Sequence, residues 1–410
     1  MNSLAALRYR NFRLLWIGLL VSFTGSMMQN AAVLWQVSLL VAPEHKGLAL
    51  GVVGLVRVGP IVLLSLVSGV VADVLNRRML MMVANLVAAI VSLALAILTL
   101  RGLFVVWPVY AVTAVGSAVS AFDLPARQAL LPMLVSREDL PNALSLNATM
   151  MQVASVAGPA LTGVLIATTG GVGAIYVVNA ISFFFVIGAL LAMRDVPERE
   201  AATTGKKDEV SLAAALEGLR FVFSAPLIRS TMLLDFFATF FSSAMALLPI
   251  FAQDILHVGA QGYGWLYAAP AAGALVMSVF MVPLTERIER RGEVLLWAVI
   301  AYGVATVVFG LSRSFWLTFA CLAATGATDT VSMVIRNIVR QLETPDRLRG
   351  RMSGVNMVFF MGGPQLGEFE AGAVANWFGA PLSVITGGVG CVAATVWIAL
   401  TTPTLRHYRK

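Results

Sequence analysis

Twelve long apolar runs, separated by short polar breaks, occupy most of the chain. They cover residues 12–41, 47–72, 79–101, 104–131, 141–169 and 172–193, and then 226–254, 260–285, 294–312, 315–340, 350–377 and 380–402. Most of the runs reach the ~20 residues that a helix needs to cross a hydrocarbon core about 30 Å thick. The pattern predicts an all-α integral membrane protein with twelve transmembrane helices.

Composition supports this fold class. The 410 residues are 59% hydrophobic and only 12% charged, whereas soluble domains are about 25% charged. The net charge of +7 is carried by short gaps between the runs, which argues against nucleic-acid binding. The two cysteines, Cys321 and Cys391, lie in apolar runs without metal-ligand partners nearby, so we expect no metal site.

The basic residues predict the orientation. With twelve spans, Lys46, Arg101 and Arg313 fall on one side, Arg57 lies within a span, and all the other Lys and Arg, with both termini, fall on the opposite side. The positive-inside rule makes that side cytoplasmic. We therefore expect a multi-pass protein of the bacterial cytoplasmic (inner) membrane with both termini in the cytoplasm.

One long polar break divides the runs into two sets of six. It predicts an N-terminal six-helix bundle at 1–194, a cytoplasmic linker at 195–225 and a C-terminal six-helix bundle at 226–410. Within the linker, Leu212, Leu216, Leu219 and Phe223 recur at helical spacing, which indicates an amphipathic helix on the membrane surface. "DVLNRR" at 73–78 parallels "ERIERR" at 286–291, and "AGPALTG" at 157–163 parallels "GGPQLGE" at 362–368. The bundles are therefore expected to be pseudo-symmetric, as in one class of secondary transporters.

Several motifs resemble the major facilitator superfamily. Gly69, Asp73, Arg77 and Arg78 match its signature loop after the second span, while Val74 and Asn76 depart from it. "FDLPARQALLPMLV", "NALSLNATMMQVASVAGPALTG" and "TPDRLRGRMSG" resemble the branch of enterobactin exporters, macrolide-efflux proteins and transmembrane secretion effectors. The resemblance covers almost the whole chain and implies a cytoplasmic-membrane exporter of small molecules.

The resemblance also suggests two mechanical motifs. The first is a cytoplasmic gate, which would close when charged residues of the two halves meet. Alternatively, these charges could merely fix the topology. The candidate gate residues are Asp73, Arg77, Arg78, Asp123, Arg127, Arg336, Arg349 and Arg351. The second is a pair of Gly-Pro helix bends. They are expected to let helices pack closely and, by analogy, to limit leak across the interface between the halves. The candidate residues are Gly158, Pro159, Gly163, Gly363 and Pro364.

Polar residues recur at helical spacing along spans one, four, seven and ten, which line the central cavity in the superfamily, and nearby aromatic residues are added to them. A single Ser or Thr can instead bond to its own helix. We expect the cavity to be lined by Ser22, Ser26, Gln29, Trp35, Gln36, Thr113, Ser117, Ser120, Phe236, Thr239, Phe240, Ser242, Tyr267, Thr325, Phe359 and Phe360. Thr113 lies near the position where drug/proton antiporters usually carry an arginine.

Ionisable residues within spans are costly and are therefore functional candidates. Asp235 lies ~12 Å from the cytoplasmic end of span seven, and Asp329 lies ~21 Å from the outer end of span ten. In a core about 30 Å thick, these two positions are at similar depths. They are expected to form a shared site that carries a proton or holds a cationic substrate, although Asp235 could also be structural. Arg57 is expected to pair with Glu368 or Glu370, as an outer gate or as simple charge neutralisation.

The sequence favours a secondary active exporter of a small amphipathic molecule, such as a drug, a macrolide or a siderophore. The chain has no ATP-binding loop of the Gly-x-x-x-x-Gly-Lys-Ser/Thr type, so we expect a proton gradient as the energy source and no cofactor. It has no nucleophile–base pair, so an enzyme is not expected. A monomer in the lipid bilayer is expected. The alternatives are a lipid or lysophospholipid transporter of the same fold and a non-transporting membrane receptor.

Overall fold

A computed structural model describes residues 4–74, 76–102, 104–194 and 212–409, and within these ranges the chain forms helices and turns without a strand. The chain divides into two compact units. Unit 1 holds Met1–Val41 and Val56–Gly205, and unit 2 holds Ala42–Leu55 and Lys206–Lys410. Residues 42–55, at the start of the second apolar run, belong to unit 2, and the predicted bundle boundaries stay a prediction.

Unit 1 contains α1 (Arg10–Leu40), the later part of α2 (Lys46–Val74), α3 (Arg77–Leu100), α4 (Trp107–Leu130), α5 (Leu140–Thr169) and α6 (Gly173–Ala192). Local signals set several helix ends. The Asn76 side chain accepts hydrogen bonds from the backbone N–H groups of Arg78 and Met79 and so caps α3. Gly170, with φ of 74°, ends α5 in the left-handed conformation that glycine adopts without strain.

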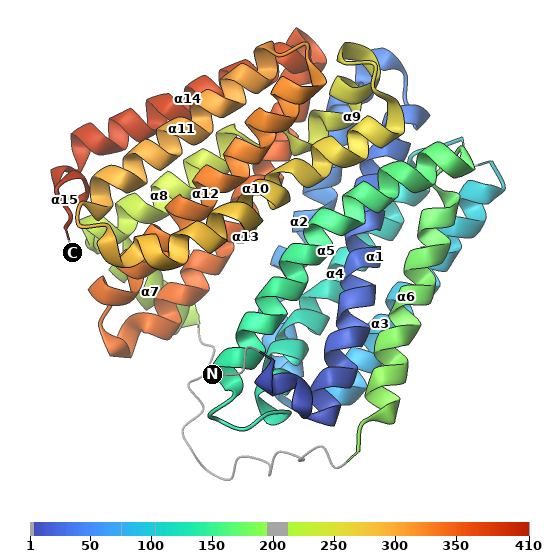
Figure 1. Ribbon diagram of the computed structural model, residues 1–410, viewed down its shortest axis with the longest axis horizontal. Helices are drawn as coiled ribbons and strands as arrows, with labels where there is room; N and C mark the ends of the chain where they lie inside the picture. Colours follow the sequence, from blue (N-terminus) through green and yellow to red (C-terminus); the bar gives the residue numbers. More distant parts are fainter. Residues whose placement is uncertain (1–3, 75, 103, 195–211, 410) are drawn as a thin grey trace. The chain divides into compact units, whose positions relative to one another are not determined.

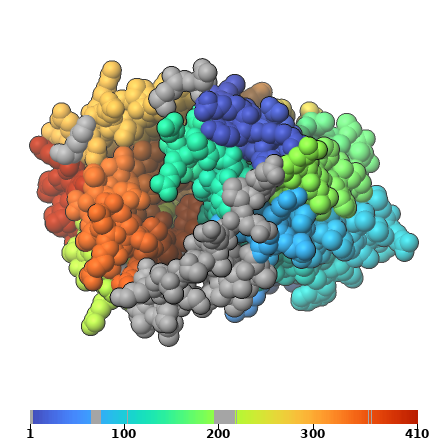
Figure 2. All heavy atoms as spheres, turned by 90° about the horizontal axis from the view of Figure 1, so that it is seen from below, coloured from blue at the N-terminus to red at the C-terminus, as the bar shows by residue number. Residues whose placement is uncertain are grey.

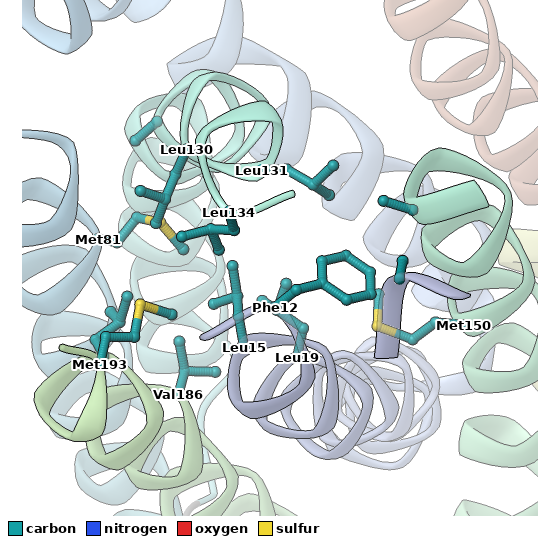
Figure 3. Packing of buried hydrophobic residues seen from close by; sticks show 14 residues of the cluster. Phe12, Leu15, Leu19, Met81, Leu130, Leu131, Leu134, Met150, Val186 and Met193 are labelled. Carbon is teal, nitrogen blue, oxygen red and sulfur yellow. The ribbon is translucent and has the colours of Figure 1, made fainter. Parts of the chain in front are cut away.

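The core of unit 1 lies near the start of α1 and the end of α6 (Figure 3). Phe12, Leu15 and Leu19 of α1 lie in one cluster with Met81 of α3 and Val186 of α6. Asn11 joins this end by donating to the Arg194 carbonyl, and Figure 2 shows the dark blue start of α1 beside green atoms of the α6 end. Because lipid tails are as apolar as Leu, contacts within the bilayer stabilise the bundle mainly by close packing.

Unit 2 contains α7 (Leu212–Ser224), α8 (Pro226–Phe241), α9 (Leu248–Ile250), α10 (Gly259–Arg287), α11 (Arg291–Leu311), α12 (Phe315–Glu343), α13 (Arg349–Phe378), α14 (Ala380–Thr401) and α15 (Pro403–Arg406) (Figure 1). The helix α10 packs along α12, and α11 packs along α14 and α12. The helix α13 runs beside α8, α14 and α7. The unit is therefore tied together mainly by long helices that pack side by side.

Eleven helices in the described ranges are long and apolar enough to cross a membrane. α13 has 30 residues and is the twelfth helix of spanning length, although it carries Arg349, Arg351, Glu368 and Glu370. The predicted twelve-helix membrane fold is confirmed. The seventh predicted span is interrupted: α8 ends at Phe241, a 3₁₀ turn covers Ala244–Leu247, and a π-helical turn covers Phe251–Ile255.

The first part of α2 packs against α13 within unit 2. A Cβ atom at Gly51 would lie 3.0 Å from the Phe369 carbonyl oxygen, and one at Gly54 would lie 2.5 Å from the Gln365 carbonyl oxygen. On the other helix, a Cβ at Gly372 would lie 2.5 Å from the Gly47 carbonyl oxygen. Glycine on both helices therefore lets the two backbones approach closely, as at small-residue interfaces in membranes.

The linker helix forms where the sequence predicts it, at Leu212–Ser224. Its buried side includes Val222, which packs with Ile228 and Met232 of α8 and Met352 of α13. Leu219 and Phe223, from the predicted apolar stripe, remain 39% and 46% exposed. The helix α7 is thus attached to unit 2 by a face other than the one expected to meet the membrane.

Candidate functional site

A buried ion-pair cluster joins α8 and α12 in unit 2. Arg336 Nη2 lies 3.0 Å from Asp235 Oδ1, and Arg340 Nη2 lies 3.2 Å from Asp235 Oδ2. The three side chains are only 3–4% exposed. Both oxygens of the Asp235 carboxylate are therefore paired with a guanidinium group.

Asp329 lies at the edge of the same cluster. The Arg336 Nη2 atom that contacts Asp235 is also 3.3 Å from Asp329 Oδ1. Unlike Asp235, the Asp329 side chain is 44% exposed. The sequence placed the two aspartates at similar depths, and the structure joins them through one nitrogen of Arg336, which sequence reasoning assigned to the gate. The cluster contains two positive and two negative groups and is neutral when all four are ionised.

Arg340 extends the cluster to α13. Its Nη1 donates to Asn356 Oδ1 at 2.5 Å, and its Nη2 donates to the Thr231 carbonyl at 3.2 Å. Sequence reasoning overlooked Arg340 and Asn356. A signal for Arg340 was present, because positions 329, 336 and 340 are separated by seven and four residues and share one helix face.

Part of the hydrogen-bonding capacity of the arginines is unused. Arg336 Nε and Nη1 and Arg340 Nε are buried and have no hydrogen-bond partner in the described part of the chain. A buried donor without a partner costs free energy. The geometry of this cluster is thus determined by charge pairing rather than by complete hydrogen bonding.

Aromatic side chains gather on α8 directly after Asp235. The Phe236 ring stacks on Phe240 with centroids 5.5 Å apart and meets Phe359 of α13 edge-on at 5.9 Å. A Cβ atom at Gly363 would lie 2.6 Å from Thr239 Oγ1, so α13 approaches α8 closely here. Four predicted cavity residues, Phe236, Thr239, Phe240 and Phe359, therefore lie close together on α8 and α13.

The remaining predicted residues of unit 2 are more dispersed. The Tyr267 ring packs against Tyr263 with centroids 5.8 Å apart, and Phe360 is exposed. Thr325 donates to the carbonyl of Leu322 in its own helix, and Ser242 lies at the end of α8. Pro364 lies inside α13. These positions are spread over α8, α10, α12 and α13.

In unit 1, Asp123 of α4 has two side-chain partners. Its carboxylate lies 2.6 Å from Arg127 Nη2 and accepts from Asn85 Nδ2 at 3.1 Å. Arg77 donates to the Ala129 carbonyl at 3.1 Å, and Arg78 donates to the Leu191 carbonyl at 3.4 Å; the gate role of these residues stays a prediction. The two arginines therefore tie the start of α3 to the ends of α4 and α6.

The other gate residues are only partly described. The side chain of Asp73 lies outside the described part of the chain, so its contacts stay a prediction. Arg349 Nη1 is 2.9 Å from Asp346 Oδ1, and Arg351 pairs with Glu217 of α7. The described contacts of these two arginines thus lie at the start of α13.

The glutamines of α1 contact helices of their own unit. The Gln29 side-chain oxygen accepts from Ser92 of α3 at 2.6 Å and from Asn179 of α6 at 2.7 Å. Two turns further along α1, Gln36 accepts from Tyr176 at 2.6 Å and donates to Thr99 at 3.0 Å. These hydrogen bonds connect α1, α3 and α6, and sequence reasoning did not anticipate Ser92, Asn179 and Tyr176.

The other expected cavity residues of unit 1 have mixed surroundings. Thr113 and Ser120 donate to carbonyls in their own helix. Ser22 and Trp35 are buried, and Ser26 and Ser117 are half-buried. Their role on a transport path stays a prediction.

The structure describes the surroundings of Arg57 in unit 1 and those of Glu368 and Glu370 in unit 2. Arg57 donates to the Asn30 carbonyl at 3.2 Å, and Glu368 is buried on α13. Glu370 is half-buried. Their pairing stays a prediction.

The predicted bend in α5 is a close helix contact. A Cβ atom at Gly158 would lie 2.5 Å from Met27 Cβ of α1, and Pro159 lies inside the helix. Gly163 is buried on α5 as well. The packing role that we expected of this motif is therefore present.

Solved structures with this arrangement of helices are membrane transporters. A bacterial homolog of the human lysosomal transporter Spinster, inward-facing and unoccupied, aligns with a TM-score of 0.75 and 15% identity, covering 97% of this chain and 98% of that one. An inward-facing bacterial homologue of the iron transporter ferroportin aligns with a TM-score of 0.72 and 16% identity, covering 97% and 99%. The chain thus has the fold of the major facilitator transporters.

The sequence identifies the family within this class. The profile of the transmembrane secretion effectors matches residues 1–407, and the chain belongs to this family. The multidrug efflux pump Tap of Mycolicibacterium fortuitum is 30% identical over 349 residues, which are 81% of this chain and 82% of Tap. The enterobactin exporter EntS of Citrobacter koseri is 27% identical over 394 residues, which are 96% of this chain and 89% of EntS.

The chain is therefore a multi-pass membrane transporter of the major facilitator type that acts on small molecules. Its relatives and its fold are those of transporters and not of enzymes.

Proposed function

We propose that this transporter exports a small amphipathic molecule, such as a drug, a macrolide or a siderophore, across the bacterial cytoplasmic membrane in exchange for protons. Efflux relatives such as Tap and EntS support the direction and the kind of substrate. The basic turns support a membrane orientation with both termini in the cytoplasm.

The observation that carries the proposal is the sharing of Arg336 Nη2 by buried Asp235 and half-exposed Asp329. A proton or a cationic group that arrives at Asp329 replaces the guanidinium there, and Arg336 then remains paired with Asp235. The same carboxylate cannot hold a proton and a cationic group at once. Competition of this kind is the requirement for exchange of one against the other.

The aromatic group supplies the apolar part of the site. Phe236 follows Asp235 directly in α8, and its ring lies with those of Phe240 and Phe359. Aromatic faces bind apolar rings and attract cations. An amphipathic cation therefore fits this combination of a carboxylate and phenyl rings better than a sugar does.

The test is ethidium transport in inverted membrane vesicles with an imposed pH gradient. We expect Asp329→Asn to abolish pH-driven transport at wild-type levels of folded protein. Asp235→Asn should abolish it as well when transport is normalised to the amount of folded protein, since this variant removes a partner of two buried arginines. Asp254→Asn is the matched control, because Asp254 is 48% exposed and also ion-paired, with Lys46 at 3.0 Å. Normal pH-driven transport by Asp329→Asn would contradict the proposed exchange.

A second candidate is the transport of lipids or lysophospholipids. A cavity of about 360 Å³ lies between α1, α5 and α6 and is lined mainly by apolar side chains, among them Met28, Leu161, Ile181 and Phe185. Such a lining suits an acyl chain. Lysophosphatidylcholine would then compete with ethidium, whereas an absence of competition and of lysolipid transport rejects this candidate. A non-transporting receptor would keep its function in both aspartate variants.

A further inference from the structure

The helix α7 lies at the point where membrane-spanning helices end. Only Ala225 separates α7 from α8, which opens the span Pro226–Ile255. The turn between α12 and α13, residues 344–348, follows another span, Phe315–Glu343. Figure 1 shows α7 close to α13, whose first residues it contacts. Residues of α7 and of this turn are therefore close to the boundary between hydrocarbon and water.

Ion pairs attach α7 to this boundary. Glu217 of α7 pairs with Arg351 of α13, and Arg347 of the turn lies 3.8 Å from its other oxygen. Buried Val222 adds an apolar contact with Met352. These contacts use one face of α7 and leave Leu219, Arg220 and Phe223 exposed.

The uncovered face of α7 combines apolar and basic side chains. Leu219 and Phe223 are 39% and 46% exposed and are four residues apart, so they lie on one face of the helix. Arg220 is exposed next to them. An exposed Phe–Leu pair flanked by arginine is typical of helices that lie in the lipid headgroup region.

The charges around this face do not balance. In the described part of the chain, α7 and residues 344–351 carry Arg220, Arg347, Arg349 and Arg351, and the carboxylates that pair with this group are Glu217 and Asp346. Arg347 has a 78% exposed side chain, which can turn toward an additional anion. Two positive charges are therefore left uncompensated by these carboxylates next to an exposed apolar surface.

We propose that α7 and the turn between α12 and α13 form a binding site for one anionic phospholipid. Arg220 and Arg347 hold the phosphate of the headgroup, and Leu219 and Phe223 contact the first part of the acyl chains. Basic residues near a membrane surface favour anionic lipids over zwitterionic ones. The site is distinct from the ion-pair cluster and is independent of the substrate and of proton coupling.

The test is native mass spectrometry of the full chain, purified in detergent and titrated with phosphatidylglycerol or phosphatidylcholine. We expect the wild type to bind phosphatidylglycerol more tightly. We expect Arg220→Gln to weaken phosphatidylglycerol binding about fivefold, since one basic residue contributes about that factor, and to leave phosphatidylcholine binding unchanged. Phe223→Ser should weaken the binding of phosphatidylglycerol as well.

Arg290→Gln is the matched control, because Arg290 is exposed in another turn of unit 2 and should not affect the binding. Arg220→Gln leaves both ion pairs of Glu217 intact, so α7 should remain attached. Equal affinity of the wild type for both lipids, or equal effects of Arg220→Gln and Arg290→Gln, would overturn the proposal. Displacement of phosphatidylglycerol by equimolar sn-glycerol 3-phosphate would also overturn it, because the site would then bind phosphate alone.

Discussion

At the scale of single residues, Asp235 shows how a charge is accommodated among membrane helices. Its two oxygens meet Arg336 and Arg340, and Arg340 also bonds Asn356. Desolvation of each ion is expensive, and the attraction between them offsets that cost only while every partner is present. Loss of one partner therefore affects the fold more than loss of an exposed ion pair.

We predict that Arg340→Met destabilises the protein by about 3–5 kcal/mol, because it leaves the Asp235 carboxylate with one cation. The double variant Asp235→Asn with Arg340→Met should recover part of this loss, since the buried charge is removed as well. Thermal unfolding in detergent measures both effects. The exposed control Arg290→Gln should change stability by no more than about 1 kcal/mol. Equal stability of Arg340→Met and the wild type would contradict the buried pairing.

A pH-dependent contact lies outside the spanning helices, at the start of α5. The Tyr9 hydroxyl donates to Asp139 at 2.8 Å, Arg8 lies 2.5 Å from the same oxygen, and Ser136 donates to it at 3.2 Å. These hydrogen bonds, with that of Tyr9 first, hold the pKa of Asp139 below its usual value. The contact thus favours the ionised carboxylate.

We predict that Tyr9→Phe lowers the thermal midpoint at neutral pH and that this difference fades in acid. A depressed folded-state pKa stabilises the fold above the unfolded value, ~3.9, and the contribution is lost as the pH falls through the folded value. Midpoints measured between pH 3 and pH 7 test this sign. In Asp139→Asn the pH dependence of the Tyr9→Phe effect should be absent, and its persistence there would assign the effect to another group.

At the scale of elements, the start of α2 is built to lie against α13. Gly54 faces the Gln365 backbone with no room for a side chain. We predict that Gly54→Ala destabilises unit 2 by about 1–3 kcal/mol, because the added methyl group forces the two backbones apart. The thermal midpoint of unfolding and the rate of ethidium transport should both decrease.

Gly354→Ala is the control on α13, because a Cβ atom there meets nothing within 4 Å. It should stabilise the helix by up to about 1 kcal/mol through the higher helix propensity of alanine. If Gly54→Ala were equally stabilising, the close approach of α2 and α13 would be wrong.

Sequence patterns predicted the positions of the helices better than they predicted which helices pack against one another. Hydropathy located the long membrane helices, because a bilayer requires long apolar helices. The interruption after Phe241 was missed, since Ser242 and Ser243 lie in an otherwise apolar run. The polar spacing along α1 was visible, but only packing places Gln29 against Ser92 and Asn179. Periodicity identifies a helix face and does not identify which neighbour the face meets.

At the scale of the whole molecule, the distribution of basic residues predicts which turns are accessible from each side. We expect a cysteine at exposed Glu44 to react with a membrane-impermeant maleimide in intact cells, and one at exposed Glu289 to react only after the membrane is opened. Background labelling should be low, because Cys321 and Cys391 are buried. Reaction of the Glu289→Cys variant in intact cells would reverse the proposed orientation.

The assignment of residues 42–55 to unit 2 has a consequence for splitting the protein. The polypeptide passes between the units near residues 41, 55 and 205, so a cut within 195–211 leaves two covalent connections in place. A separately produced fragment 206–410 would lack the glycine-bearing start of α2, which packs on α13, and would expose that surface of α13. Co-production with fragment 1–205 would restore the cover, so the two fragments should be recovered as a pair and the second alone should be unstable.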